Sequence, residues 1–170
     1  FPRISEAYLN KDFPSSLSVV IKERKQAAIL CALEDCFFID ENGFVFERAP
    51  YFSGDVYLKF LDEREETRNL ASNWKQGFQL IPEGQFKKII DFRDLISREN
   101  IKVSEIILKK EGIYEMDISE GGHILLNEQN DAKISFENLK ITLDSKIQND
   151  RQKLEYIDLR FGNKVFYKFK

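Results

Sequence analysis

Histidine and paired carboxylates are the side chains of this sequence whose types could carry out acid–base or nucleophilic chemistry. The single histidine, His123, lies in the stretch EGGHILLN, directly after a Gly-Gly turn. A Ser-His-Asp or Cys-His catalytic site would have to use it, but no nucleophile motif lies nearby. We therefore interpret His123 as a residue at the surface or at the end of a strand.

Two carboxylate pairs could in principle perform general acid–base catalysis, Glu65 with Glu66 and Glu155 with Asp158. Because the chain has 29 acidic residues, such pairs arise by chance, and we interpret them as solvated faces. No GxGxxG, P-loop or HExxH pattern occurs. The sequence gives no positive sign of an enzyme, and we predict no cofactor, no metal and no small-molecule substrate.

The two cysteines, Cys31 and Cys36, stand five positions apart in the stretch ILCALEDCFF. A C-x4-C spacing with no second pair of ligands does not suit zinc. The two side chains could face each other across a short hairpin and form a disulfide in an oxidising compartment. The alternative is two small apolar strand residues, because free cysteine is commonly buried and the spacing alone does not fix the disulfide geometry.

Composition and charge indicate a folded chain that does not bind nucleic acid. The 170 residues are 42% hydrophobic and 13% aromatic, enough for one ordinary domain or two small ones. The 26 basic and 29 acidic residues are mixed, with no basic stripe of the kind that binds nucleic acid. The sequence contains no run of 18 apolar residues, the length needed to span a membrane as a helix. The chain has no initiator Met and enters directly as a strand, so we read it as a fragment whose missing upstream part could hold a membrane anchor.

The pattern predicts many short strands. Strands are expected at 4–10 and 17–24, joined by a turn at Pro14, and the strand pattern continues through AAILCA. A hairpin is expected at 36–47, with Asn42 and Gly43 supplying the positive φ angles of its turn. Residues 48–83 are ambiguous: YLKFLDE suits a strand or the start of a helix, and REETRNLASNWKQ suits a surface helix.

Two amphipathic helices interrupt the strands. The first is predicted at 84–100, where Phe86, Ile89 and Ile96 share one side. The second follows Asn130 or Asp131, either of which could cap it, and carries an apolar stripe of Phe136, Leu139, Leu143 and Ile147. Strands are expected between the helices, and two more close the chain. We predict an α+β fold with a mainly antiparallel, curved sheet and two or three helices packed on one side.

Three short motifs occur in order along the chain: FPSSLSVVIKERKQAA, FFIDENGFVFE and YIDLRFGNKVFYK. Together they resemble segments of the FtsQ/DivIB family of bacterial cell-division proteins. The stretch FPSSLSVVIKERKQAA resembles the segment that closes the POTRA domain of that family, with Gln26 where proline is usual. FFIDENGFVFE resembles the hairpin that follows, and YIDLRFGNKVFYK resembles the closing strand segment. The motif residues given a structural role are Pro14, Glu23, Arg24, Asp40, Gly43 and Asp158.

The resemblance implies that residues 1–28 are the C-terminal part of a POTRA domain and 29–170 the β domain. It implies a non-catalytic scaffold of the division machinery, anchored by a single upstream transmembrane helix and placed outside the membrane at the septum. It further implies FtsB/DivIC-type and FtsL-type partners, control of septal peptidoglycan synthesis, and addition of a partner strand to the last strand. A POTRA-containing module of an outer-membrane assembly or secretion system is the alternative.

The closing hairpin, 156–170, is the segment that this role would use. A two-residue turn at Gly162-Asn163 suits the glycine but mixes lysines into the apolar face. A three-residue turn separates apolar from polar side chains, and we predict its register, which pairs Phe161 with Val165, Leu159 with Tyr167 and Ile157 with Phe169. Val165, Tyr167 and Phe169 are then buried, and the other face shows Arg160, Lys164, Phe166, Lys168 and Lys170.

Lysines on an edge strand are a common device against unwanted strand pairing. The same lysines, beside open backbone groups, attract an acidic extended partner and repel a copy of the strand. We favour the partner interpretation. The residues expected to bind are Arg160, Phe161, Lys164, Val165, Phe166, Tyr167 and Lys168.

Overall fold

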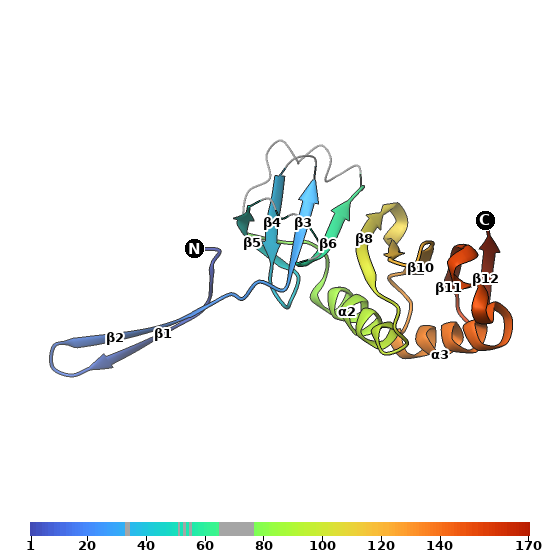
Figure 1. The fold of residues 1–170 in the computed structure, drawn as a ribbon. Helices are drawn as coiled ribbons and strands as arrows, with labels where there is room; N and C mark the ends of the chain where they lie inside the picture. The colour runs from blue at the N-terminus through green and yellow to red at the C-terminus, as the bar shows by residue number, and fades with distance from the viewer. Residues whose placement is uncertain (33–34, 51, 53, 55, 65–76) are drawn as a thin grey trace.

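The computed structural model describes residues 1–32, 35–50, 52, 54, 56–64 and 77–170 (Figure 1). Within these residues the fold is α+β, with one large, mostly antiparallel sheet and two α-helices. The strands are β1 (Ile4–Asp12), β2 (Ser16–Glu23), β3 (Ala28–Ala32), β4 (Asp35–Ile39), β5 (Phe44–Ala49), β6 (Leu58–Asp62), β7 (Phe78–Gln79), β8 (Val103–Lys109), β9 (Ile113–Ile118), β10 (His123–Asn127), β11 (Leu154–Phe161) and β12 (Lys164–Phe169).

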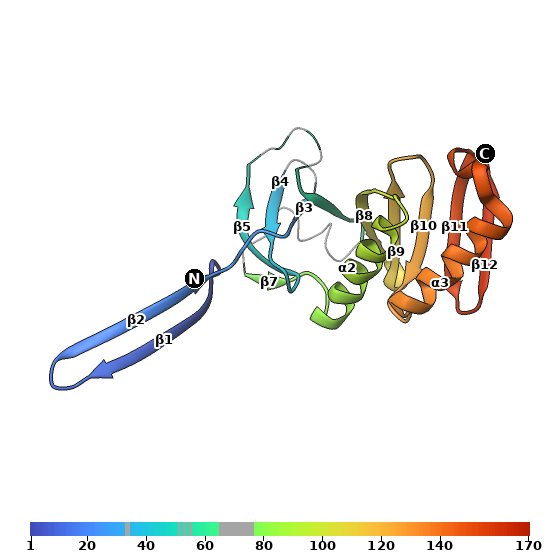
Figure 2. The ribbon, with the colours of Figure 1, turned by 60° about the horizontal axis from the view of Figure 1, so that its bottom comes forward.

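The large sheet has ten strands in the order β12-β11-β10-β9-β8-β6-β3-β4-β5-β7. Three neighbouring pairs are parallel, β3 with β6, β6 with β8 and β10 with β11, and the other pairs are antiparallel. The two helices, α2 (Glu83–Ser97) and α3 (Ala132–Thr142), lie on one side of this sheet (Figure 2). The predicted fold class is therefore confirmed at this level.

Both helices form where the apolar periodicity predicted them. On α2, Phe86, Ile89, Phe92 and Ile96 are buried against the sheet. The Asp131 carboxylate caps α3 by accepting from the backbone N–H groups of Lys133 and Ile134. The predicted apolar stripe of the second helix runs to Ile147, but α3 ends at Thr142. It is followed by a π-helical turn (Leu143–Ile147) and a 3-10 segment (Gln148–Lys153), and Gln148 has a φ of +49°.

The segment 48–83 contains two short strands among its described residues. The stretch YLKFLDE, which suited a strand or a helix, forms strand β6, and β7 follows at 78–79. The surface helix predicted over REETRNLASNWKQ falls almost wholly on residues 65–76, outside those described, as does the pair Glu65 and Glu66. No helix in the described part of the chain has both the length and the apolarity needed to cross a membrane.

Strands β1 and β2 form a separate two-stranded antiparallel hairpin that projects from the large sheet (Figure 1). Its turn contains Pro14, as predicted, and the Phe13–Pro14 peptide is cis. The register places Leu9 opposite Val19 and Ala7 opposite Ile21, so one face is apolar. Leu9, Val19 and Ile21 are all at least half exposed. Since an isolated two-stranded hairpin is at best marginally stable in water, we expect another layer of protein to cover this apolar face.

The cysteines are joined by a disulfide. Cys31 on β3 and Cys36 on β4 are directly opposite in the antiparallel register, and their Cα atoms are 4.2 Å apart. That separation is typical of a non-hydrogen-bonded antiparallel pair, where side chains approach most closely. The bond stands beside an aromatic cluster on the helix-free face of β3–β5 that includes Phe38 and Phe46.

Reduction of the disulfide is expected to lower the free energy of unfolding by about 2 kcal/mol, the chain-entropy value for so short a loop. Urea unfolding of the wild-type chain with and without reductant measures it. The double variant Cys31→Ala/Cys36→Ala is the control, and its unfolding midpoint should not change with reductant. Identical midpoints for oxidised and reduced wild type would contradict the expectation.

Candidate partner-binding edge

The last two strands form the end of the large sheet, with α3 lying across their helix side (Figure 2). Strand β11 pairs with β10 on one side and β12 on the other. No strand in the described ranges pairs with the far side of β12. The open edge expected from the sequence is therefore present.

The register of this hairpin differs from the predicted one. Phe161 pairs with Lys164 across a two-residue turn in which Gly162 has a φ of +65°, so the glycine decides the turn. Further along, Asp158 pairs with Phe166 and Ile157 with Tyr167. An extra residue on β11 between these positions makes a β-bulge. The three-residue turn was therefore wrong, but the bulge returns each side chain of β12 to the predicted face.

The predicted burial of β12 is correct for one residue only. Val165 is partly buried against the core, whereas Tyr167 and Phe169 are each 37% exposed. Their rings contact each other edge to face, with centroids 5.6 Å apart. A strand at the end of the sheet has neighbours on one side only, so its helix-facing side chains keep a free flank. That flank is apolar surface next to an open backbone.

Asp158 and Arg160 hold the bulge together. The Asp158 carboxylate is buried and accepts from the Arg160 backbone N–H at 3.1 Å, from its Nε at 2.9 Å and from its Nη2 at 2.6 Å. The backbone donor that the bulge leaves unpaired is thus satisfied by a side chain. The bond to Asp158 also raises the pKa of Arg160 above its ordinary value. Arg160 was predicted to bind the partner, but its guanidinium is already bound to the Asp158 carboxylate within the domain.

Two asparagines at and just after the end of β10 bond to the backbone of the bulge. Where β10 ends, Asn127 donates to the carbonyl of Arg160 at 3.2 Å and Asn130 donates to the carbonyl of Leu159 at 3.0 Å. The Arg160 N–H and the carbonyl groups of Leu159 and Arg160 thus all have side-chain partners at the bulge.

The backbone of β12 presents alternate residues to the outside. The Lys170 N–H donates inward to the carbonyl of Lys153 at 2.8 Å. Both bulges lie on β11, so β12 alternates regularly and Lys164, Phe166 and Lys168 also face β11. The N–H and C=O groups of the other set, Val165, Tyr167 and Phe169, then point away from the sheet. These six groups are the pairing face of the edge.

The helix-free side of the edge carries aromatic and basic side chains. Phe161 and Phe166 are about half exposed and contact edge to face, with centroids 5.4 Å apart. They border a shallow open depression with Tyr156 and Lys164. Lys168 forms an ion pair with Glu155 at 2.6 Å, which raises the pKa of the lysine. Of the predicted site residues, Phe161, Lys164, Phe166 and Lys168 therefore lie together here.

The same Asp-x-Arg interaction occurs a second time in the fold, at a place that the sequence analysis did not identify. The buried Asp62, at the end of β6, accepts from the Arg64 backbone N–H at 3.1 Å and from its Nη2 at 2.6 Å. The spacing Asp-x-Arg is the same as at 158–160 and was visible in the sequence. It was overlooked because the surrounding segment gave no clear periodicity.

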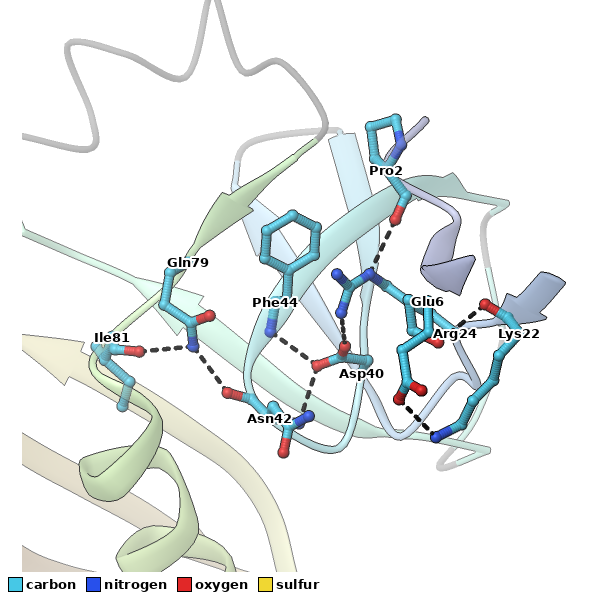
Figure 3. Close-up of polar contacts among 10 residues, drawn as sticks. Pro2, Glu6, Lys22, Arg24, Asp40, Asn42, Phe44, Gln79 and Ile81 are labelled. Carbon is cyan, nitrogen blue, oxygen red and sulfur yellow. Dashed lines mark hydrogen bonds and ion pairs between the residues drawn. The ribbon is translucent and has the colours of Figure 1, made fainter. Parts of the chain in front are cut away.

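The motif residues Arg24 and Asp40 meet where the projecting hairpin joins the large sheet (Figure 3). The Arg24 guanidinium makes an ion pair with the buried Asp40 carboxylate, donates from Nε to the carbonyl of Pro2 at 2.9 Å, and lies 4.0 Å from the ring centroid of Phe44. Asp40 also accepts from the backbone N–H of Asn42 at 2.8 Å and of Phe44 at 3.0 Å. Arg24 thus ties the hairpin to the β4–β5 turn.

Gly43 and Glu23 occupy the same joint. Gly43 has a φ of +83°, as its turn position predicted, whereas Asn42 does not share the positive φ expected of it. A Cβ at Gly43 would lie 2.7 Å from the Phe86 ring, so the close approach of turn and helix requires glycine. Glu23 is exposed and lies 3.6 Å from Arg3. The described contacts give Glu23 a minor role.

Replacing Arg24 with alanine is expected to lower the free energy of unfolding by about 2 kcal/mol, because Asp40 stays buried and keeps only its backbone donors. Hydrogen exchange should also speed up selectively in β1 and β2. Urea unfolding and exchange mass spectrometry measure the two effects. Arg3→Ala, which removes only exposed ion pairs, is the matched control and should change stability by less than about 1 kcal/mol. Equal exchange rates in Arg24→Ala and wild type would show that the joint does not depend on this pair.

A scan against protein-family models finds no family that matches this chain, and a search of curated proteins finds no significant match. The family resemblance carried by the three sequence motifs therefore stays a prediction.

Proposed function

We propose that this chain is the extracytoplasmic part of a non-catalytic scaffold of the bacterial division machinery, of the FtsQ/DivIB type. It would bind FtsB/DivIC-type and FtsL-type partners by strand addition at β12 and so influence septal peptidoglycan synthesis. The observation that carries the proposal is the open edge of β12, where the backbone groups of Val165, Tyr167 and Phe169 pair with no described strand and lie beside exposed aromatic and basic side chains.

The edge defines the chemistry of a strand that would pair with it. Side chains opposite Tyr167 and Phe169 would lie on the helix side, against apolar surface, so apolar residues fit there. Side chains opposite Lys164 and Lys168 would lie on the helix-free side, so acidic residues fit there. A partner strand with alternating apolar and acidic residues suits both faces.

The projecting hairpin supports the proposed domain division at residue 28. Its apolar face, with Leu9, Val19 and Ile21, is uncovered by any described residue, which is what the closing strands of a POTRA domain would show without the rest of that domain. The disulfide suits an oxidising, extracytoplasmic compartment. In the proposed arrangement an upstream helix anchors the protein in the membrane at the septum.

Binding of this chain to the extracytoplasmic segments of the FtsB- and FtsL-type proteins of the same genome tests the proposal. We expect the wild-type chain to bind, and Phe166→Ala to weaken binding at least about tenfold, because this exposed ring lies at the centre of the edge. Charge reversal at Lys164, which makes no ion pair among the described residues, should slow association and do so most at low salt.

Arg160→Glu is unsuitable as a binding variant, because it would place a second carboxylate against the buried Asp158. The exposed Lys102 directly precedes β8, which three strands separate from β12, so Lys102→Glu is the charge-matched control for Lys164→Glu. Undiminished binding by both Phe166→Ala and Lys164→Glu would remove β12 as the docking edge. Absence of binding by folded wild type would overturn the scaffold proposal for these partners.

A further inference from the structure

Three side chains that can ligate metal ions meet on the helix-free face of the sheet. On β9, Tyr114, Met116 and Ile118 are buried against the core, so Glu115 and Asp117 project to the opposite face. His123, on β10, is directly opposite Asp117 in the register. Because all three stand on paired strands of one sheet, their spacing is fixed by the backbone ladder.

The distances suit one small ion. One ligand atom from each residue lies within 4.8 Å of the other two. His123 Nδ1 is 2.7 Å from Asp117 Oδ1 and 3.7 Å from Glu115 Oε1. An ion that binds nitrogen and oxygen at about 2.0–2.2 Å holds neighbouring ligand atoms about 3 Å apart. Small rotations of the two carboxylates would therefore close the three atoms around it.

The cluster has more carboxylates than lysines. Lys109 contacts the other oxygen of Glu115, Oε2, at 2.6 Å, and Oε1 stays turned toward His123. The side chain of Asp117 has only the imidazole of His123 as a partner among the described residues. A cation bound between Glu115 and Asp117 would be attracted by both carboxylates.

We propose that Glu115, Asp117 and His123 form a binding site for a divalent transition-metal ion, of which Zn²⁺ is the type. The imidazole nitrogen selects against Mg²⁺ and Ca²⁺, which prefer oxygen ligands. Three protein ligands leave at least one coordination position open, and His123 is exposed enough to be reached from solvent. The site is separate from the β12 edge and does not depend on the proposed partners. It departs from the absence of a metal predicted from the sequence.

The site is tested by titrating the tag-free chain with ZnCl₂. Calorimetry measures the affinity, and NMR shows whether the imidazole takes part. Since the chain has a single histidine, one set of imidazole ring signals reports on it without ambiguity. We expect one equivalent of Zn²⁺ to shift or broaden those signals, and MgCl₂ at the same concentration to leave them unchanged. His123→Gln, which removes the imidazole ligand, should lower Zn²⁺ affinity at least about tenfold. Asp117→Asn should do the same.

Glu155→Gln is the control, because it removes a carboxylate from the neighbouring strand β11 without touching the cluster, and its Zn²⁺ affinity should match that of wild type. Binding that is equally strong in His123→Gln and wild type would mean diffuse attraction by carboxylates and would overturn the proposal. Unmoved imidazole signals at millimolar Zn²⁺ would overturn it as well.

Discussion

Replacing Asp158 with alanine is expected to lower the free energy of unfolding by about 3 kcal/mol. Its carboxylate is buried and satisfies the Arg160 backbone N–H and two guanidinium nitrogens at once. Without it, the bulge has an unpaired backbone donor and the Arg160 side chain, which is 27% exposed, loses its counter-ion. Because water still reaches the guanidinium, the expected loss lies at the low end for a broken buried pair.

Urea unfolding followed by circular dichroism measures this loss. Asp150→Ala is the matched control, because Asp150 forms an exposed ion pair with Lys153 at 2.7 Å and its removal should cost less than about 1 kcal/mol. Similar destabilisation by the two variants would show that the Asp158–Arg160 pair does not stabilise the bulge.

Side-chain periodicity is enough to predict the fold class and both helices. Phe86, Ile89 and Ile96 on one helix, and Leu139, Leu143 and Ile147 on the next segment, are buried as their spacing indicates. The order of the strands in the sheet, in contrast, cannot be predicted from side-chain periodicity. Nothing in the local sequence indicates that β6 lies between β3 and β8, because that order depends on contacts between distant parts of the chain.

The candidate edge shows how local rules combine. The turn preference of Gly162 and the burial preference of Val165 predicted two incompatible registers, and the chain satisfies both by placing a bulge on β11. The signal for that bulge was the Asp-x-Arg spacing at 158–160, which can cap an unpaired N–H. The cluster of Glu115, Asp117 and His123 needed the β9–β10 register, since an isolated histidine in sequence carries no ligand set.

The disulfide illustrates a choice that sequence leaves open and geometry decides. Cys31 and Cys36 could have faced opposite sides of the sheet after a register change of one residue. The β3–β4 pairing puts them directly opposite on the same face. In general, disulfides persist in oxidising compartments and are rare where thiols are kept reduced.

Replacing Tyr167 with proline is expected to weaken partner binding about 100-fold while the domain stays folded, a loss of about 2.7 kcal/mol of binding free energy. The Tyr167 N–H points away from β11, so proline removes a donor that the fold does not use. It also blocks the close approach of an added strand at the middle of the pairing face. Proline is tolerated on edge strands at this kind of position.

Lys168→Pro is the contrasting variant, because the Lys168 N–H faces β11 in the pair with Tyr156. Its loss breaks a ladder bond of the fold, so this variant should unfold at a clearly lower urea concentration. Tyr167→Ala separates the side chain from the backbone: it keeps the N–H and should weaken binding less than Tyr167→Pro. Calorimetry with the FtsB-type segment and urea unfolding together give the comparison. Equal binding by Tyr167→Pro and Tyr167→Ala would mean that the partner contacts side chains only, and strand addition at β12 would be wrong even if the scaffold assignment held.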